Sequence, residues 1–358
     1  MKCAICVEPK KPLEIIDVID PIPKAHEVIV RTVATSICHS DLHLLDGTWP
    51  HPMPVVAGHE SAGIVEKVGR NVDQIKVGDK VVVCSVRACG NCYYCKIGAS
   101  QCCTNTFSDS TSTLKTVDNQ TVYIGLRMGG FAERMVVDHR QLAILPAKMP
   151  LEKASLLACG VLTGYGAVVN TAQVKPGKSV GVIGVGGVGL NSIQTARLVG
   201  ATQVIAIDTN DDKLEKAMSF GASHAINNGE EGVKEKVWEA TEGRGLDYCF
   251  VTAPVMSAAE LGIQITGLLG QIIIVGFGNW DQKIPVPINQ LMLEKSITAS
   301  RMGSGRVSID IPRLAQYYLD GRFKLDELIS ERFQFSDINL AIESSKAGVG
   351  IRNMIQFT

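Results

Sequence analysis

Residues 179–208 read SVGVIGVGGVGLNSIQTARLVGATQVIAID, and this stretch decides the fold of the chain. It begins with a short apolar run that is typical of a buried strand and leads directly into Gly184, Gly186 and Gly189, in the order G-x-G-x-x-G. Apolar and small residues then return at helical spacing, and a second apolar run ends at Asp208. The stretch therefore predicts a strand, a glycine-rich turn, a helix and a second strand.

This arrangement suits a bound dinucleotide. Glycine at 184 permits a tight turn, glycine at 186 lets the backbone approach a pyrophosphate, and glycine at 189 lets helix and strand pack closely. The N-terminus of the helix also attracts the negative phosphates. Asp208 can accept hydrogen bonds from the adenosine ribose, which favours NAD over NADP. A bare glycine motif is more often only a turn, but the flanking strands, helix and acid favour a nucleotide site.

Helix and strand patterns continue to alternate after Asp208. We expect helices at 211–222, 231–242 and 256–267, and strands at 224–227, 246–253 and 270–277. This alternation predicts an α/β fold with a doubly wound parallel sheet that ends near Ser300. The residues before the glycine motif instead predict short antiparallel strands, with a polar surface loop at 107–123.

The composition limits the range of partners. The chain has 358 residues, a formal net charge of −1 and 46% hydrophobic residues, enough for two domains with separate cores. The near-neutral charge gives no reason to expect nucleic acid or a membrane as partner. We find neither a signal-peptide core nor a run of membrane-spanning length, and expect a cytoplasmic protein. Eleven cysteines in that compartment point to metal binding rather than to disulfides.

One segment, CGNCYYCKIGASQCC at 89–103, carries most of these cysteines. Cys89, Cys92 and Cys95 follow one another at x2 intervals, and either Cys102 or Cys103 can supply a fourth thiolate. Four thiolates on one loop can surround a tetrahedral Zn²⁺ as a closed structural site. This interpretation is favoured over a redox or iron–sulfur role.

The motifs together resemble the zinc-dependent medium-chain alcohol dehydrogenases over essentially the whole chain. The resemblance rests on CHSDLH at 38–43, GHE at 58–60, the cysteine segment, Cys159 with GVLTGYG, and GVGGVG through Asp208. It implies a Rossmann doubly wound parallel sheet plus a mostly β, GroES-like catalytic domain with a structural zinc lobe. It further implies a zinc-binding catalytic domain at 1–160, an NAD-binding domain at 161–300, and a return to the catalytic domain at 301–358.

The resemblance also assigns the metal ligands. It implies a catalytic zinc on Cys38, His59 and Cys159, with Glu60 close behind the metal and Asp41 orienting the histidine ring. For the structural zinc it favours Cys103 over Cys102, which makes two Zn²⁺ per chain.

The same family pattern implies a route for the proton and a set of cofactor contacts. Ser40 would accept the alcohol proton, which passes through the nicotinamide ribose to His43. His39 stands where many relatives have arginine, so we expect weaker NADH binding than in an arginine variant. Trp49 and Ser85 would line the substrate pocket. The residues implied to contact NAD are His39, Thr163, Gly184, Gly186, Gly187, Val188, Gly189, Asp208, Lys213, Val275, Phe277 and Arg352.

Three functional hypotheses follow. The first is an NAD-dependent dehydrogenase for primary or aromatic alcohols and their aldehydes, acting as a homodimer or homotetramer. The second is a thiol-adduct formaldehyde dehydrogenase or a polyol dehydrogenase on the same fold. The formaldehyde enzymes of the family use an arginine shortly after the last lobe cysteine, and residues 104–108 contain none. The third is a non-catalytic nucleotide-binding protein, which we would expect to have lost one of the zinc ligands.

Overall fold

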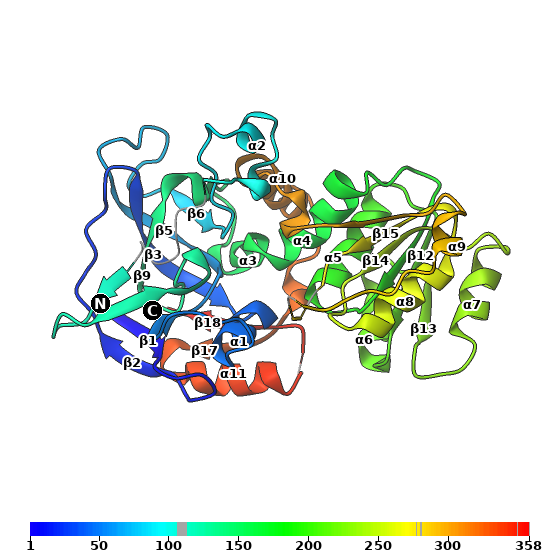
Figure 1. Ribbon diagram of the computed structural model, residues 1–358. Coiled ribbons are helices and arrows are strands. Elements are labelled where there is room, and N and C mark those ends of the chain that lie inside the picture. The colour runs from blue at the N-terminus through cyan, green and yellow to red at the C-terminus, as the bar shows by residue number, and fades with distance from the viewer. Residues whose placement is uncertain (106–112, 277, 280, 349, 358) are drawn as a thin grey trace. The chain divides into compact units, whose positions relative to one another are not determined.

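The computed structural model describes residues 1–105, 113–276, 278–279, 281–348 and 350–357. The chain forms two compact units (Figure 1). The first unit is built from two segments, Met1–Gly160 and Arg306–Thr358, and the second unit, Val161–Gly305, is inserted between them. The beginning and the end of the chain therefore belong to the same unit.

The second unit contains a six-stranded parallel sheet in the order β13-β12-β11-β14-β15-β16. The first strand in sequence lies inside the sheet, and the chain winds first to one edge and then to the other. This is the doubly wound order of dinucleotide-binding sheets, and it confirms the predicted fold class. The strands are β11 (Ser179–Ile183), β12 (Gln203–Asp208), β13 (His224–Asn227), β14 (Leu246–Val251), β15 (Thr266–Ile274) and β16 (Ser296–Ala299); the helices are α4 (Gly160–Gly166), α5 (Gly187–Leu198), α6 (Asp211–Ser219), α7 (Val233–Ala240), α8 (Met256–Ile265) and α9 (Ile288–Leu291).

Burial explains why these segments form strands. Val180, Val182, Ile205, Phe250 and Ile272 are each 0% exposed, and they come from the inner strands of the sheet. Parallel strands are covered by helices on both faces, so their sequences are continuous apolar runs rather than alternating ones. The β-branched residues among them also suit the extended backbone.

The first unit is mostly β. Its larger sheet has the order β10-β6-β5-β3-β18-β17, with β9 also paired to β3, and its smaller sheet has the order β2-β1-β4-β8-β7. Its strands are β1 (Lys2–Cys6), β2 (Glu14–Asp17), β3 (Glu27–Ser36), β4 (Val55–Val56), β5 (Glu60–Val68), β6 (Lys80–Val83), β7 (Thr113–Lys115), β8 (Thr121–Ile124), β9 (Arg134–Asp138), β10 (Leu142–Ile144), β17 (Ile329–Gln334) and β18 (Arg352–Gln356). Its helices are α1 (His39–Leu45), α2 (Tyr93–Lys96), α3 (Leu151–Ser155), α10 (Val307–Leu319) and α11 (Ile338–Lys346).

The loop expected at 107–123 is wrong in its second half. Residues 106–112 lie outside the described part of the chain, but β7 and β8 pair as antiparallel strands. Leu114 and Val122 are partners in this pairing and are buried. Their burial outweighs the polar composition that predicts a loop, because one apolar face is enough to hold a short strand on a sheet.

Among the described residues, no single helix combines the length and the apolar character of a membrane span. One bent pair of helices, Leu151–Ala158 with Gly160–Thr171, passes that test by length and composition only.

Candidate active site

Three segments of the first unit bring four metal-binding side chains together. Cys38 directly precedes α1, His59 and Glu60 lie at the start of β5, and Cys159 directly precedes α4. Their sulfur, imidazole and carboxylate atoms all lie within 4.8 Å of one another, and all four residues are buried. Their separation in sequence therefore disappears in the fold.

The pairing of β3 with β5 positions two of these ligands. Ser36 and Glu60 are partners in this antiparallel pair, so the residues just beyond each of them, Cys38 and His59, come close together. Gly58 turns the chain into β5 with φ +94°, and a Cβ atom there would lie 2.6 Å from the backbone nitrogen of Phe131. The turn before the histidine therefore requires glycine.

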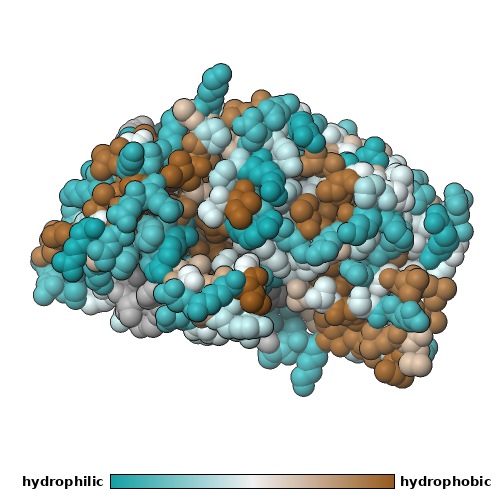
Figure 2. Space-filling view, turned by 90° about the horizontal axis from the view of Figure 1, so that it is seen from above, coloured by the Kyte–Doolittle hydropathy of each residue, from teal (hydrophilic) through white to brown (hydrophobic). Residues whose placement is uncertain are grey.

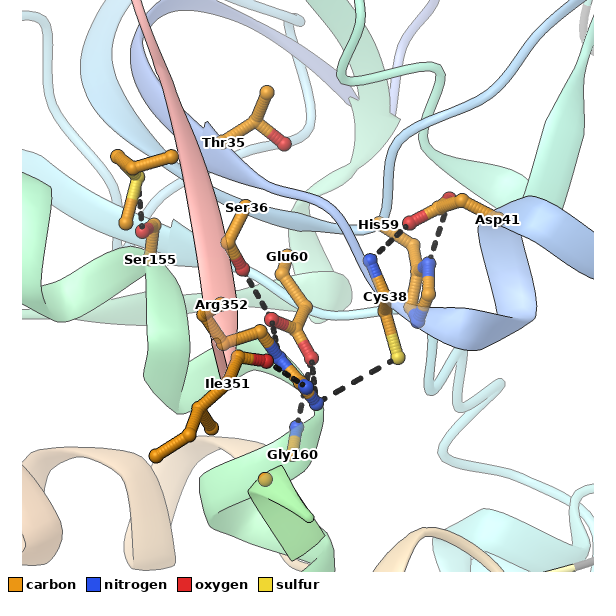
Figure 3. A network of polar contacts seen from close by, with 12 residues as sticks. Thr35, Ser36, Cys38, Asp41, His59, Glu60, Ser155, Gly160, Ile351 and Arg352 are labelled. Atoms are coloured by element: carbon orange, nitrogen blue, oxygen red, sulfur yellow. Dashed lines mark hydrogen bonds and ion pairs between the residues drawn. The ribbon is translucent and has the colours of Figure 1, made fainter. Parts of the chain in front are cut away.

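Asp41 fixes the ligands from behind. Its Oδ1 accepts a hydrogen bond from His59 Nδ1 at 2.9 Å and another from the backbone N–H of Gly58 at 2.9 Å. Its Oδ2 accepts one from the backbone N–H of Cys38 at 3.1 Å, and Figure 3 shows the carboxylate reaching both Cys38 and His59. Because Asp41 occupies Nδ1, the Nε2 atom of His59 is left to bind a metal.

Glu60 and Arg352 form a buried ion pair beside Cys38 (Figure 3). Arg352 Nε lies 3.0 Å from Glu60 Oε2, and its Nη2 lies 3.8 Å from Cys38 Sγ. The other Glu60 oxygen accepts a hydrogen bond from the backbone N–H of Gly160 at 3.1 Å, and the Ser36 hydroxyl also donates to the carboxylate. The guanidinium thus offsets the charge of a carboxylate and a thiolate away from water.

Hydrogen bonding and burial set the protonation of this group without metal. A hydrogen bond from the Cys159 thiol lowers the pKa of Cys38 well below its usual range, and the nearby Arg352 charge adds to this shift. The same hydrogen bond and burial raise the pKa of Cys159 well above its usual range. Burial raises the pKa of Glu60, although Arg352 opposes the shift. Zinc binds thiolates, so its binding releases the proton that the two sulfurs share.

The donor set suits zinc. Two sulfurs and one imidazole are the ligands already known for the catalytic zinc of alcohol dehydrogenases, and three protein ligands leave a fourth position for water or substrate. Cys38, His59 and Cys159 would hold the ion. Zinc in such a site supplies a positive charge that stabilises an alkoxide.

A second cluster, in the cysteine segment, fits a closed zinc site. Cys89 Sγ lies 3.9 Å from Cys95 Sγ, and Cys92 Sγ lies 3.9 Å from Cys103 Sγ. A tetrahedron with Zn–S bonds of 2.3 Å requires sulfurs about 3.8 Å apart, so both opposite edges match. Cys102 is exposed, and the fourth sulfur comes from Cys103.

Backbone groups and one arginine support this cluster. Cys89 Sγ accepts hydrogen bonds from the N–H of Asn91 at 3.4 Å and of Cys92 at 3.3 Å. Backbone hydrogen bonds lower the pKa of Cys92 to about 5, whereas burial raises the pKa of Cys95 to about 12. Arg140, held by Asp138, donates to the carbonyl of Cys89 at 2.8 Å and ties the lobe to the end of β9.

The three glycines of the nucleotide motif have the geometry expected of them. Gly184 has φ +92°, and a Cβ atom at Gly189 would lie 2.0 Å from the carbonyl oxygen of Gly184. A Cβ atom at Gly186 would meet nothing within 4 Å, so this position is open to a ligand. Asp208 Oδ2 accepts a hydrogen bond from the N–H of Val185, inside the turn, at 2.6 Å.

The structure places the remaining nucleotide-contact candidates of the second unit near this turn or farther along the sheet. Gly187 and Val188 begin α5, and Lys213 lies in the first turn of α6. Thr163 is buried in α4, and Val275 follows β15, where its N–H donates to the Val251 carbonyl. Phe277 lies outside the described residues.

The candidates for proton transfer and substrate contact lie in the first unit. His39 and Ser40 begin α1, next to Cys38, and His43 follows one turn later. The His43 ring packs against the Trp49 ring with centroids 5.3 Å apart. Ser85 follows β6 and is half-buried.

Two contacts of the catalytic cluster go beyond the sequence analysis. The Ser36 hydroxyl and the Gly160 N–H both hold Glu60, and Arg352, expected only at the cofactor, also reaches Cys38. The position of Ser36, two residues before a ligand at a strand end, is the only signal that points to it.

Comparison with known proteins agrees with this geometry. A family model described as "Alcohol dehydrogenase GroES-like domain" matches residues 24–147, and one described as "Zinc-binding dehydrogenase" matches residues 187–318. The "Alcohol dehydrogenase class-3" of Myxine glutinosa is 35% identical over 372 residues, covering 99% of this chain and 97% of the relative. The similarity therefore extends over both units.

Solved structures have the same fold over the full chain. A zinc-binding-domain alcohol dehydrogenase from Burkholderia ambifaria is 32% identical with a TM-score of 0.96, covering 100% of this chain and 98% of that one. The benzyl alcohol dehydrogenase of Acinetobacter calcoaceticus is 30% identical with a TM-score of 0.91, covering 100% and 99%. The chain belongs to the zinc-dependent medium-chain alcohol dehydrogenases, oxidoreductases that act on CH–OH groups.

Proposed function

We propose that this enzyme uses NAD to interconvert primary or aromatic alcohols and their aldehydes. The observation that carries the proposal is the buried cluster of Cys38, His59 and Cys159, whose ligand atoms converge within 4.8 Å. A metal held by these three side chains keeps one position for an alcohol oxygen. A non-catalytic nucleotide-binding protein would have no need to retain this set.

For the proton we infer a path along α1. Ser40 lies two residues after Cys38 and is placed to accept the proton of a bound alcohol. His43, half-buried and packed on Trp49, then passes the proton toward water. A histidine suits this end of the path, because its ordinary pKa lies near neutral pH.

For the cofactor we infer NAD. The open position at Gly186 and the close approach at Gly189 support pyrophosphate binding at the glycine turn. The Asp208 carboxylate lies at this turn, where it favours a free ribose hydroxyl over a 2′-phosphate. A similar structure from Escherichia coli CFT073, 27% identical with a TM-score of 0.85 and covering 100% of this chain and 99% of that one, is a complex with NADH. We also infer that His39 and Arg352 meet the pyrophosphate, and that Thr163, Val188 and Val275 meet the nicotinamide.

For the substrate, the likeness to a benzyl alcohol dehydrogenase favours aromatic and primary alcohols. Trp49 narrows the pocket in this proposal and Ser85 widens it. A thiol-adduct formaldehyde dehydrogenase is the second candidate, supported by the 35% identity with a class-3 alcohol dehydrogenase. The absence of arginine from residues 104–108 argues against that candidate.

We further infer a homodimer or homotetramer in the cytoplasm. Leu268, Leu269, Ile288 and Met292 are 69–76% exposed near the edge of the parallel sheet, and Figure 2 shows apolar side chains gathered at the end of this unit that carries α9 in Figure 1. Such a patch is suited to a second copy of the chain. All eleven cysteines are free thiols, as expected in a reducing compartment.

The test combines zinc analysis with initial rates. The purified protein should hold two zinc ions per chain and oxidise benzyl alcohol and primary alcohols with NAD. Cys159→Ala should lose one zinc and the activity while still binding NADH. Zinc-loaded protein that oxidises none of these alcohols, or a Cys159→Ala variant with wild-type rates, would overturn the proposal. Activity with formaldehyde only when glutathione is added would favour the second candidate.

A further inference from the structure

We propose that Asp211 is a second specificity residue for the coenzyme, and that it excludes a 2′-phosphate independently of Asp208. This inference rests on the proposed use of NAD. It assigns separate tasks to two carboxylates at one edge of the parallel sheet: Asp208 supports the glycine turn, and Asp211 supplies repulsion.

Asp208 is already engaged in holding the turn. Its Oδ2 accepts the N–H of Val185 at 2.6 Å, and its Oδ1 accepts the N–H of Asn210 at 3.1 Å. Val185 lies between Gly184 and Gly186, where the pyrophosphate of either coenzyme would bind. Replacing Asp208 therefore removes a support of the turn along with a negative charge, and both coenzymes should lose affinity.

Asp211 is held at the same edge by the next strand. Asn227, at the end of β13, is the parallel partner of Asp208 at the end of β12. Its Nδ2 donates to Asp211 Oδ1 at 2.7 Å, while its own Oδ1 accepts the N–H of Gly229 at 2.8 Å. Neighbouring strands are about 4.8 Å apart, so this chain of hydrogen bonds fixes the Asp211 carboxylate beside that of Asp208.

The charge at this position distinguishes the two coenzymes. NADP carries a 2′-phosphate of nearly two negative charges on the ribose that Asp208 faces, whereas NAD carries a neutral hydroxyl. A carboxylate about 6 Å from such a phosphate, in a wet site, opposes binding by about tenfold. Asp211 makes no contact with the glycine turn in the hydrogen bonds above, so its replacement should spare NAD.

The experiment measures NADH and NADPH dissociation constants by nicotinamide fluorescence. The main variant is Asp211→Asn, which keeps the shape of the side chain and can still accept from Asn227. We expect NADPH to bind about tenfold more tightly and NADH to be unaffected. Asp208→Asn should weaken both coenzymes, and the double variant should bind NADPH about tenfold better than Asp208→Asn alone.

Asp212→Asn is the matched control, because Asp212 lies in the same first turn of α6 and is exposed. An unchanged ratio of the two constants in Asp211→Asn, or an equal gain in Asp212→Asn, would overturn the inference. Wild-type protein that binds NADPH as well as NADH would overturn it too. Wild-type protein that binds neither coenzyme would contradict the proposed function itself, which separates the two failures.

Discussion

His59 Nδ1 donates a hydrogen bond of 2.9 Å to Asp41 Oδ1, and both side chains are buried. The same carboxylate accepts the backbone N–H of Cys38 and of Gly58. One aspartate therefore sets the ring orientation of one metal ligand and the backbone position of another. A cluster drawn from distant segments depends on such a shared support.

Replacing this support should weaken the catalytic metal site. Asp41→Ala removes three hydrogen bonds around Cys38 and His59, and we expect zinc affinity and activity to fall by about 10–100-fold. Competition with a chromogenic chelator measures the affinity. Asp46→Ala is the control, because Asp46 accepts only from the N–H of Thr48 in the same region. Wild-type zinc affinity in Asp41→Ala would contradict this role.

The structural cluster distinguishes two adjacent cysteines. Cys103→Ser removes one of the four converging sulfurs, so one of two zinc ions should be lost and the midpoint of thermal unfolding should fall. Cys102→Ser alters an exposed thiol and should leave both quantities unchanged. Atomic absorption and calorimetry measure them. The opposite result would make Cys102 the ligand.

Two glycines of the nucleotide turn should respond differently to an added methyl group. Gly186→Ala meets nothing within 4 Å, so the fold should tolerate it while the methyl group obstructs the pyrophosphate and weakens NADH binding by at least about tenfold. Gly189→Ala places Cβ 2.0 Å from the Gly184 carbonyl, so it should lower stability. Thermal melts and NADH titration separate the effects. Normal NADH affinity in Gly186→Ala would exclude this binding mode.

Asp247 should make stability depend on acid pH. Burial alone would raise the pKa of this carboxyl, but hydrogen bonds from Lys178 and Ser179 outweigh burial and hold the pKa below its usual range. The carboxylate therefore stabilises the fold above the unfolded pKa of about 3.9, and this contribution disappears as pH falls through the lower folded value.

The matching variant is Asp247→Asn. We expect it to cost about 1 kcal/mol of unfolding free energy at neutral pH, and the difference from wild type should shrink below about pH 4. Urea unfolding at several pH values measures it, with Glu260→Gln, an exposed acid of the same unit, as the control. A difference that grows toward acid pH would reverse the assigned sign.

The sequence predicts most of the second unit because its signals are local. The apolar run of β11, the three glycines and Asp208 lie within thirty residues, and each residue type has one physical reason to stand where it does. The cysteine segment is legible for the same reason. Short spacings leave few ways to arrange four sulfurs around one ion.

Long-range pairing hides the rest. The contact of Arg352 with Glu60 spans 292 residues, and it exists because β18 pairs with β3 while β3 pairs with β5. No local pattern announces that register. The hairpin of β7 and β8 escaped prediction because its few apolar residues, Leu114 and Val122, become decisive only once a sheet is there to bury them.

The insertion of one unit within the other has a consequence for synthesis on the ribosome. Residues Val161–Gly305 emerge as one uninterrupted segment, so we expect this unit to fold while translation continues. Cys38, His59 and Cys159 leave the exit tunnel earlier, yet the arginine that neutralises them is residue 352 and arrives with the last strand. Zinc capture at the catalytic cluster should therefore be completed only after the chain is released.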